Sequence, residues 1–261
     1  MSAPAAAPKT SESIRSGIDA VDRYLAGGYT SVPGMSSRFA AAICCGLLRL
    51  QTEMGVSGPI VEVGPFEGRF FIALALGLAP GEHALGIDTF NWPNQGLLDL
   101  FHSHCARHGL ARERYTAIKA NVRDLTAGDI QTTLGGPIRF WHLDGDHSRE
   151  QLLADLALAE STLHSQGIIC LDDMLHPGYP LLVVAVHEWL EQHPDWRVLC
   201  VIDREDIVAA AKFLLCHKDV VPLFEQDLMD TFKPQHWVLG SEWERYFCVV
   251  LTPQPRIAEV D

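Results

Sequence analysis

The chain has 261 residues, of which 48% are apolar, and it carries a formal net charge of −13. This length suits one large α/β domain with a sizeable core. The negative charge argues against a nucleic-acid partner, because binding phosphates requires clustered lysine and arginine. No apolar run reaches the ~18 residues that a membrane span needs.

The seven cysteines form no C-x-x-C pair and lie mostly in apolar runs, which is typical of reduced, buried thiols. The sequence also lacks the basic start and long apolar stretch of a signal peptide. We therefore expect a cytoplasmic protein that acts on a small molecule, with no nucleic-acid or membrane partner.

The first part of the chain predicts two helices after a disordered tail at residues 1–10. Apolar residues from Ile14 to Leu25 recur at helical spacing, and Ser36-Ser37 can cap a second helix that runs to about Met54. Residues 11–58 would then form a helical cap. Because these helices could cover the active site or form a dimer interface, a homo-oligomer is left open.

A glycine turn follows the first predicted strand, Ile60–Val63. The turn carries Gly64 and Gly68 and leads into an apolar helix from Arg69, and a second strand ends at Asp88. Glycines let a backbone approach a ligand closely, and a carboxylate at the second strand can hold a ribose diol. This order of elements is half of a nucleotide-binding α/β unit.

Strands and helices continue to alternate beyond Asp88. Further strands are expected near residues 115–120, 138–143 and 167–171, with helices between them that include 122–134. This alternation predicts a mostly parallel sheet with helices on both faces, over residues 59–217. Residues 196–202 and 210–217 indicate a pair of strands. Residues 218–261 are expected to pack on the same domain as an extension, and the apolar run at 246–251 has no assigned place in the sheet.

The turn itself, Glu62-x-Gly64-x-x-x-Gly68, resembles motif I of the class I S-adenosylmethionine-dependent methyltransferases. A dinucleotide site would need G-x-G-x-x-G, and the acid in this strand would repel a pyrophosphate. The departure is Phe66, where many members of the family have a third glycine. The resemblance implies a cofactor site, S-adenosylmethionine being the cofactor, made by Glu62, Gly64, Pro65, Phe66, Gly68, Asp88, Thr89, Asn121 and Asp144.

Acidic residues cluster after the next two strands. Asp144, Asp146 and His147 follow the fourth strand, and Asp172-Asp173 follow the fifth. Parallel strands end at one edge of a sheet, so these carboxylates should repel each other unless a cation joins them or some take up protons. Oxygen ligands favour a hard ion such as Mg²⁺. The alternative is that some of these acids only cap helices.

The block D-G-D-H-S followed by L-D-D resembles the branch of the same family that includes catechol-type, macrolide and sugar O-methyltransferases. The resemblance implies a seven-stranded Rossmann-like sheet with an antiparallel final strand and extra N-terminal helices. It also implies that Mg²⁺ is held by Asp144, Asp172 and Asp173. Asp144 and His147 become the catalytic candidates, and His147 takes the place of the lysine base of the catechol enzymes. Its ordinary pKa of about 6.5 suits a base at neutral pH.

Three functions remain in competition at this point. The first is metal-assisted O-methylation of a hydroxyl on a small molecule. The second is an NAD-type oxidoreductase, which binding of NAD⁺ in preference to S-adenosylmethionine would indicate. The third is a metal-free nucleotide-binding protein without catalysis, which the absence of metal dependence would favour.

Overall fold

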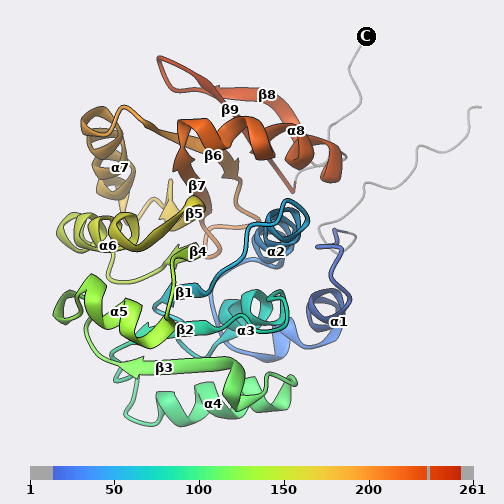
Figure 1. Cartoon of the computed structure of the whole chain (residues 1–261), viewed down its shortest axis with the longest axis vertical. Coiled ribbons are helices and arrows are strands. Elements are labelled where there is room, and N and C mark those ends of the chain that lie inside the picture. Colours follow the sequence, from blue (N-terminus) through green and yellow to red (C-terminus); the bar gives the residue numbers. More distant parts are fainter. Residues whose placement is uncertain (1–13, 234–235, 254–261) are drawn as a thin grey trace, which may run out of the picture.

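The computed structural model describes residues 14–233 and 236–253, so the predicted tail at 1–10 lies outside the described residues. Within this part of the chain, all strands join one sheet in the order β3-β2-β1-β4-β5-β7-β6-β9-β8 (Figure 1). The strands are β1 (Ile60–Val63), β2 (Ala84–Asp88), β3 (Tyr115–Lys119), β4 (Ile138–Leu143), β5 (Leu163–Met174), β6 (Trp196–Ile202), β7 (Ala211–His217), β8 (His236–Glu242) and β9 (Phe247–Leu251). Strands β1 to β5 run parallel, and β7 is antiparallel to both β5 and β6.

The predicted seven-stranded sheet is wrong in its strand count, because the described residues form nine strands. The additional pair is β8 and β9, and β9 lies parallel to β6, with Cys200 opposite Val249. The apolar run at 246–251 therefore has a place in the sheet. Cys248, Val249 and Leu251 are buried there, and burying these apolar side chains stabilises this edge of the sheet. The sequence pattern alone did not show where this run would pack.

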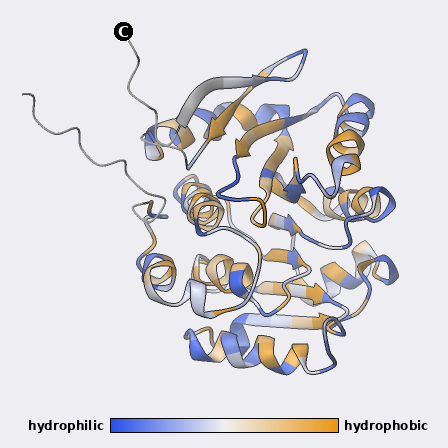
Figure 2. Cartoon of the chain, turned by 180° about the vertical axis from the view of Figure 1, so that it is seen from behind, coloured by the Kyte–Doolittle hydropathy of each residue, from blue (hydrophilic) through white to orange (hydrophobic). Residues whose placement is uncertain are grey.

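Helices cover both faces of the sheet, as predicted. They are α1 (Asp19–Gly27), α2 (Arg38–Glu53), α3 (Arg69–Leu76), α4 (Leu97–Arg107), α5 (Ala127–Leu134), α6 (Arg149–Thr162), α7 (Pro180–Gln192) and α8 (Val221–Thr231). Figure 1 shows α5, α6 and α7 on one side and α1, α2 and α3 on the other. Two apolar clusters fill the two sides, and in Figure 2 the strands between them are mostly coloured as hydrophobic.

The boundaries of three elements bear on the site. Ser37 caps α2 as predicted, since its hydroxyl accepts the Ala40 N–H at 2.9 Å. The helix predicted at 122–134 begins only at Ala127, because Thr126 and Asp129 form a capping box there. β5 is longer than predicted, so Asp172 and Asp173 belong to the end of the strand. None of the helices in the described part of the chain is long and apolar enough to cross a membrane.

A buried ion pair joins the sheet to α2. Arg139 of β4 is fully buried, and its guanidinium donates to Glu82 Oε2 at 2.6 Å and to the Leu48 carbonyl at 2.8 Å. The Glu82 side chain is only 8% exposed. The pair therefore fixes the end of α2 against β4 in a region where neither charge reaches water.

We predict that Arg139→Met lowers the free energy of unfolding by about 3–5 kcal/mol, because it leaves the Glu82 carboxylate buried without its partner. Urea unfolding followed by circular dichroism measures the loss. The matched control is Arg149→Met, which removes an exposed pair with Glu188 and should cost less than about 1 kcal/mol. Equal losses in the two variants would contradict the prediction.

Candidate active site

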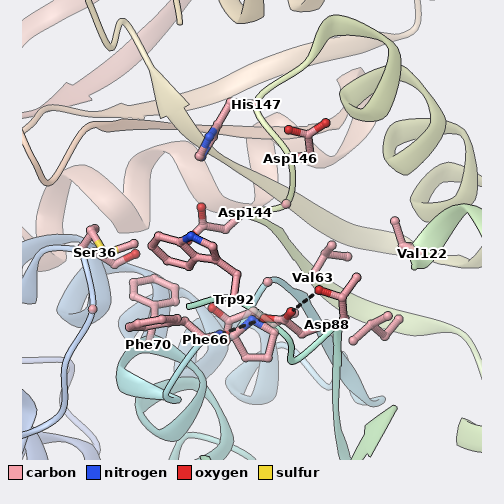
Figure 3. Close-up of a pocket in the computed structure, with 18 of the residues that line it drawn as sticks. Ser36, Val63, Phe66, Phe70, Asp88, Trp92, Val122, Asp144, Asp146 and His147 are labelled. Atoms are coloured by element: carbon pink, nitrogen blue, oxygen red, sulfur yellow. Dashed lines mark hydrogen bonds between the residues drawn. The ribbon is translucent and has the colours of Figure 1, made fainter. Parts of the chain in front are cut away.

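A cavity of about 580 Å³ opens at the carboxyl ends of β1, β2 and β4. In an open α/β sheet this edge is where ligands bind. Figure 3 shows His147, Asp144, Trp92 and Asp88 around this one cavity. Eight of the nine predicted cofactor-binding residues line it: Glu62, Gly64, Pro65, Phe66, Asp88, Thr89, Asn121 and Asp144.

The two glycines of the turn have different roles. Gly64 has a φ of 76°, and a Cβ atom there would lie 1.9 Å from the Asp144 carbonyl oxygen. Glycine is therefore required where the ends of β1 and β4 approach each other. Gly68, the predicted residue that does not line the cavity, starts α3 with a φ of 94° beneath the Phe101 ring.

The Asp88 carboxylate is held between two loops. Oδ1 accepts the Phe90 N–H at 2.9 Å, and Oδ2 accepts the Phe66 N–H at 3.3 Å. Oδ2 keeps a lone pair that can accept from a hydroxyl, and Oδ1 is also approached by the Thr89 hydroxyl at 3.4 Å. The side chain is thus already oriented for a diol before any ligand arrives.

Glu62 supplies a second acid to the wall of the cavity. The residue is 1% exposed, and its Oε1 lies 2.8 Å from His142 Nδ1. Its Oε2 has no hydrogen-bond partner among the described residues. A buried carboxylate oxygen that lacks a donor favours a ligand that brings one, such as an ammonium group.

His147 and Asp173 form a hydrogen-bonded pair at the rim. His147 Nε2 lies 2.7 Å from Asp173 Oδ2, and the imidazole stacks on the Tyr179 ring with 4.1 Å between ring centroids. The hydrogen bond to Asp173 raises the pKa of His147 above its ordinary value, more than burial lowers it. With Nε2 held by the carboxylate, Nδ1 is the nitrogen left to accept a proton.

Asp172 instead pairs with a cation inside the protein. Its Oδ2 accepts from the Lys212 ammonium and, at 3.0 Å, from the Ser36 hydroxyl, while Oδ1 accepts the Asp173 N–H at 2.8 Å. Burial alone would raise the pKa of Asp172, but the charge and the hydrogen bond of Lys212 lower it, and this pKa is held well below its usual range. Asp172 is therefore ionised, and both of its carboxylate oxygens already accept hydrogen bonds from within the protein.

Asp144 lines the cavity between these two pairs. Burial, and then the charge of Asp172, raise the pKa of Asp144 well above its usual range. Two groups of described residues bring ligand atoms within 4.8 Å of one another: His142/Asp144/Asp172 and Asp144/His147/Asp173. Neither contains all three predicted ligands. Since Asp172 is bound by Lys212 and Asp173 by His147, the three carboxylates as they stand do not fit a Mg²⁺ ion.

Some of the predicted residues also have structural roles. The Asn121 side chain lines the cavity but also caps a short 3₁₀ turn, accepting the Arg123 N–H at 3.0 Å. The cap of α6, the helix after the fourth strand, is Ser148, whose hydroxyl accepts the Gln151 N–H at 3.2 Å. Asp146 does not cap α6 and lines the cavity.

The sequence reasoning missed Lys212, Ser36 and Tyr179. One signal was present for Lys212: it is the single charged residue in the apolar stretch from Ile207 to Cys216. A lysine inside a buried strand needs an acid close by. Ser36 was expected only as part of a helix cap, and nothing in the local pattern of Tyr179 indicates its stacking on His147.

Comparison with known family models finds a match to part of the chain. The family model described as "Methyltransferase domain" matches residues 61–174, the segment from β1 to the end of β5. Comparison with curated protein sequences gave no match.

Solved structures share the fold. Cofactor-bound Rv0187 from MTB has a TM-score of 0.56 at 19% identity, over 77% of this chain and 91% of that one. An O-methyltransferase from Bacillus cereus in complex with SAH has a TM-score of 0.53 at 16% identity, over 82% of this chain and 93% of that one. The O-methyltransferase TomG from Streptomyces achromogenes, in complex with SAM, has a TM-score of 0.51 at 20% identity, over 76% of this chain and 89% of that one.

We predict that Gly64→Ala destabilises the protein more than Gly81→Ala does. Both glycines have positive φ, at 76° and 88°, so each alanine pays a strain of about 1–2 kcal/mol. Only the Cβ at position 64 meets a backbone oxygen, which adds about 1–3 kcal/mol of overpacking. Urea unfolding compares the two variants, and an equal loss would show that β1 and β4 separate without cost.

Proposed function

We propose that this chain is an S-adenosylmethionine-dependent methyltransferase that transfers the methyl group to a hydroxyl oxygen of a small molecule, with His147 as general base. The observation that carries the proposal is the His147–Asp173 pair at the rim of the cavity that Asp88 and Glu62 also line. The oxidoreductase alternative is not retained, because the matching family model is that of a methyltransferase domain.

The cofactor is assigned to the end of the cavity near β1 and β2. Asp88 accepts the two ribose hydroxyls, and the unpartnered Oε2 of Glu62 faces the ammonium of the methionine part. Gly64 lets the turn pass close beneath that part. Trp92 is 66% exposed and lies 5.8 Å from the Phe66 ring, so it can cover a bound ligand from the solvent side.

The acceptor is assigned to the rim near His147. Its hydroxyl proton passes to Nδ1 of His147 while the oxygen attacks the methyl carbon, and the carbon–sulfur bond breaks to leave S-adenosylhomocysteine. Asp173 stabilises the imidazolium that forms, and stacking on Tyr179 holds the ring in one orientation. The sulfonium charge disappears in this step, so the protein has no new ion to stabilise at sulfur.

Metal assistance stays a prediction of the resemblance and is not part of this mechanism. The predicted ligands Asp172 and Asp173 already have partners within the protein, in Lys212 and His147. The mechanism therefore depends on the residues described above and includes no step at a metal ion.

We predict that Asp88→Asn weakens binding of S-adenosylhomocysteine about tenfold to a hundredfold. Hydrogen bonds to a charged group contribute about 1.5–3 kcal/mol, and the amide loses one acceptor and the charge. Isothermal titration calorimetry measures the change, with NAD⁺ as the control ligand. Asp99→Asn, at an exposed acid on α4, should bind like the wild type. Unchanged binding in Asp88→Asn would contradict the assignment of the ribose.

The proposed reaction is tested with S-adenosylmethionine labelled at the methyl carbon and a panel of small hydroxyl compounds. The carbon chemical shift separates a methyl ether from methyl groups on nitrogen, sulfur or carbon. We predict that His147→Gln lowers the rate about a hundredfold, within the usual contribution of a general base, and removes the acid limb of the pH–rate profile.

The companion variant Asp173→Asn should move that limb to lower pH. A general base works in its neutral form, and Asp173 raises the pKa of His147. Without the Asp173 carboxylate this pKa falls, so the imidazole stays neutral, and active as a base, down to a lower pH. NMR titration of the His147 ring reports the same pKa without an acceptor. His176→Gln is the matched control, since His176 also stacks on Tyr179, at 4.8 Å, but does not line the cavity. Transfer only to nitrogen, sulfur or carbon would refute the proposed function.

A further inference from the structure

A lysine lies at the centre of the acids that end β4 and β5. Lys212 of β7 is fully buried, and its ammonium contacts Asp172, the Ser36 hydroxyl at 3.1 Å and His142 Nε2 at 3.0 Å. The Phe70 ring lies on another side, 4.6 Å from Nζ to its centroid. An ammonium has only donors, so His142 accepts at Nε2 and donates from Nδ1 to Glu62.

These contacts give Lys212 the surroundings of a bound cation. Two oxygens, one nitrogen and one aromatic face approach Nζ, and all four come from different elements of the fold. The Asp144 carboxyl also lies close enough to Lys212 for the two groups to act on each other electrostatically. A carboxylate or an ammonium buried without a partner destabilises the fold, so each of these two groups makes the burial of the other possible.

The same space is where a divalent ion would have to bind. His142, Asp144 and Asp172 bring ligand atoms within 4.8 Å of one another, and the Lys212 ammonium bonds to two of these three residues. A metal ion on Oδ2 of Asp172 would have to displace the Lys212 ammonium, which is fully buried and held by Asp172, Ser36 and His142.

We propose that Lys212 is the resident cation of this site, in place of a divalent metal, and that methyl transfer proceeds without added metal. Lys212 does not line the cavity, so it acts as a positioning residue: it fixes Asp172 and Ser36 and sets the charge beside Asp144. The catalytic part of this inference rests on the proposed function. One consequence concerns the acceptor. Where Lys212 takes the place of the metal, two vicinal hydroxyls have no ion to chelate, so an acceptor with a single hydroxyl is sufficient.

The test measures Mn²⁺ binding by electron paramagnetic resonance on full-length protein with S-adenosylhomocysteine bound. The wild type should show no saturable binding up to millimolar Mn²⁺. Lys212→Met should gain one Mn²⁺ site with a dissociation constant at least about tenfold below that millimolar limit. The reason is that His142, Asp144 and Asp172 then lack their cation. Adding Asp144→Asn to Lys212→Met should remove that site.

Lys218→Met is the matched control. This exposed lysine follows β7 directly and pairs with Asp195 away from the cavity, so its loss should leave Mn²⁺ binding as in the wild type. Saturable binding to the wild type that Asp144→Asn abolishes would overturn the proposal. So would a folded Lys212→Met that gains no site. Should Lys212→Met fail to fold, the wild-type titration decides alone.

Activity gives an independent readout. Wild-type transfer should be unchanged by EDTA and by Mg²⁺, whereas Lys212→Met should lose activity and recover part of it with Mg²⁺ or Mn²⁺. A merely structural lysine would not give such rescue, and loss of wild-type transfer in EDTA would overturn the proposal. Because Mn²⁺ binding needs no acceptor, the absence of hydroxyl methylation would refute the proposed function and leave this inference standing.

Discussion

The buried pair of Lys212 and Asp172 is the interaction on which the arrangement of the site depends. Lys212 comes from β7 and Asp172 from β5, and their contacts extend to Ser36 before α2, His142 on β4 and Glu62 on β1. Five segments of the chain therefore meet in one polar network at the end of the sheet. Such a network is stable only when every charge has a partner, because the interior gives little screening.

The network also explains how two neighbouring aspartates come to do different work. Along a strand successive side chains point to opposite sides. Asp172 points inward to Lys212, whereas Asp173, at a φ of 57°, turns outward to His147 at the rim. One acid is thus fixed in a charged state inside the protein, and the other is available to tune a base beside the cavity.

The local part of the site could be predicted from sequence, and the long-range part could not. The glycine turn, Asp88 and the acids after β4 and β5 follow from short spacings that the strand and helix periods determine. Lys212 and Asp172 are brought together by the antiparallel register of β5 and β7, in which Leu171 lies opposite Phe213. The register, like the pairing of β9 with β6, depends on contacts between segments that no local pattern encodes.

The charge distribution supports a division of the cavity into two ends. Near β1 and β2, Glu62 and Asp88 present carboxylate oxygens that suit the ammonium and the two hydroxyls of the proposed cofactor. Near the rim, His147 has a raised pKa because Asp173 holds it, and Asp144 between the two ends favours its neutral form because burial and Asp172 disfavour a second charge. A neutral Asp144 can donate a hydrogen bond to an acceptor oxygen, which a metal-bound carboxylate could not do. With Lys212 as the proposed resident cation, the acids at this edge would form hydrogen bonds to a single hydroxyl rather than coordinate an ion.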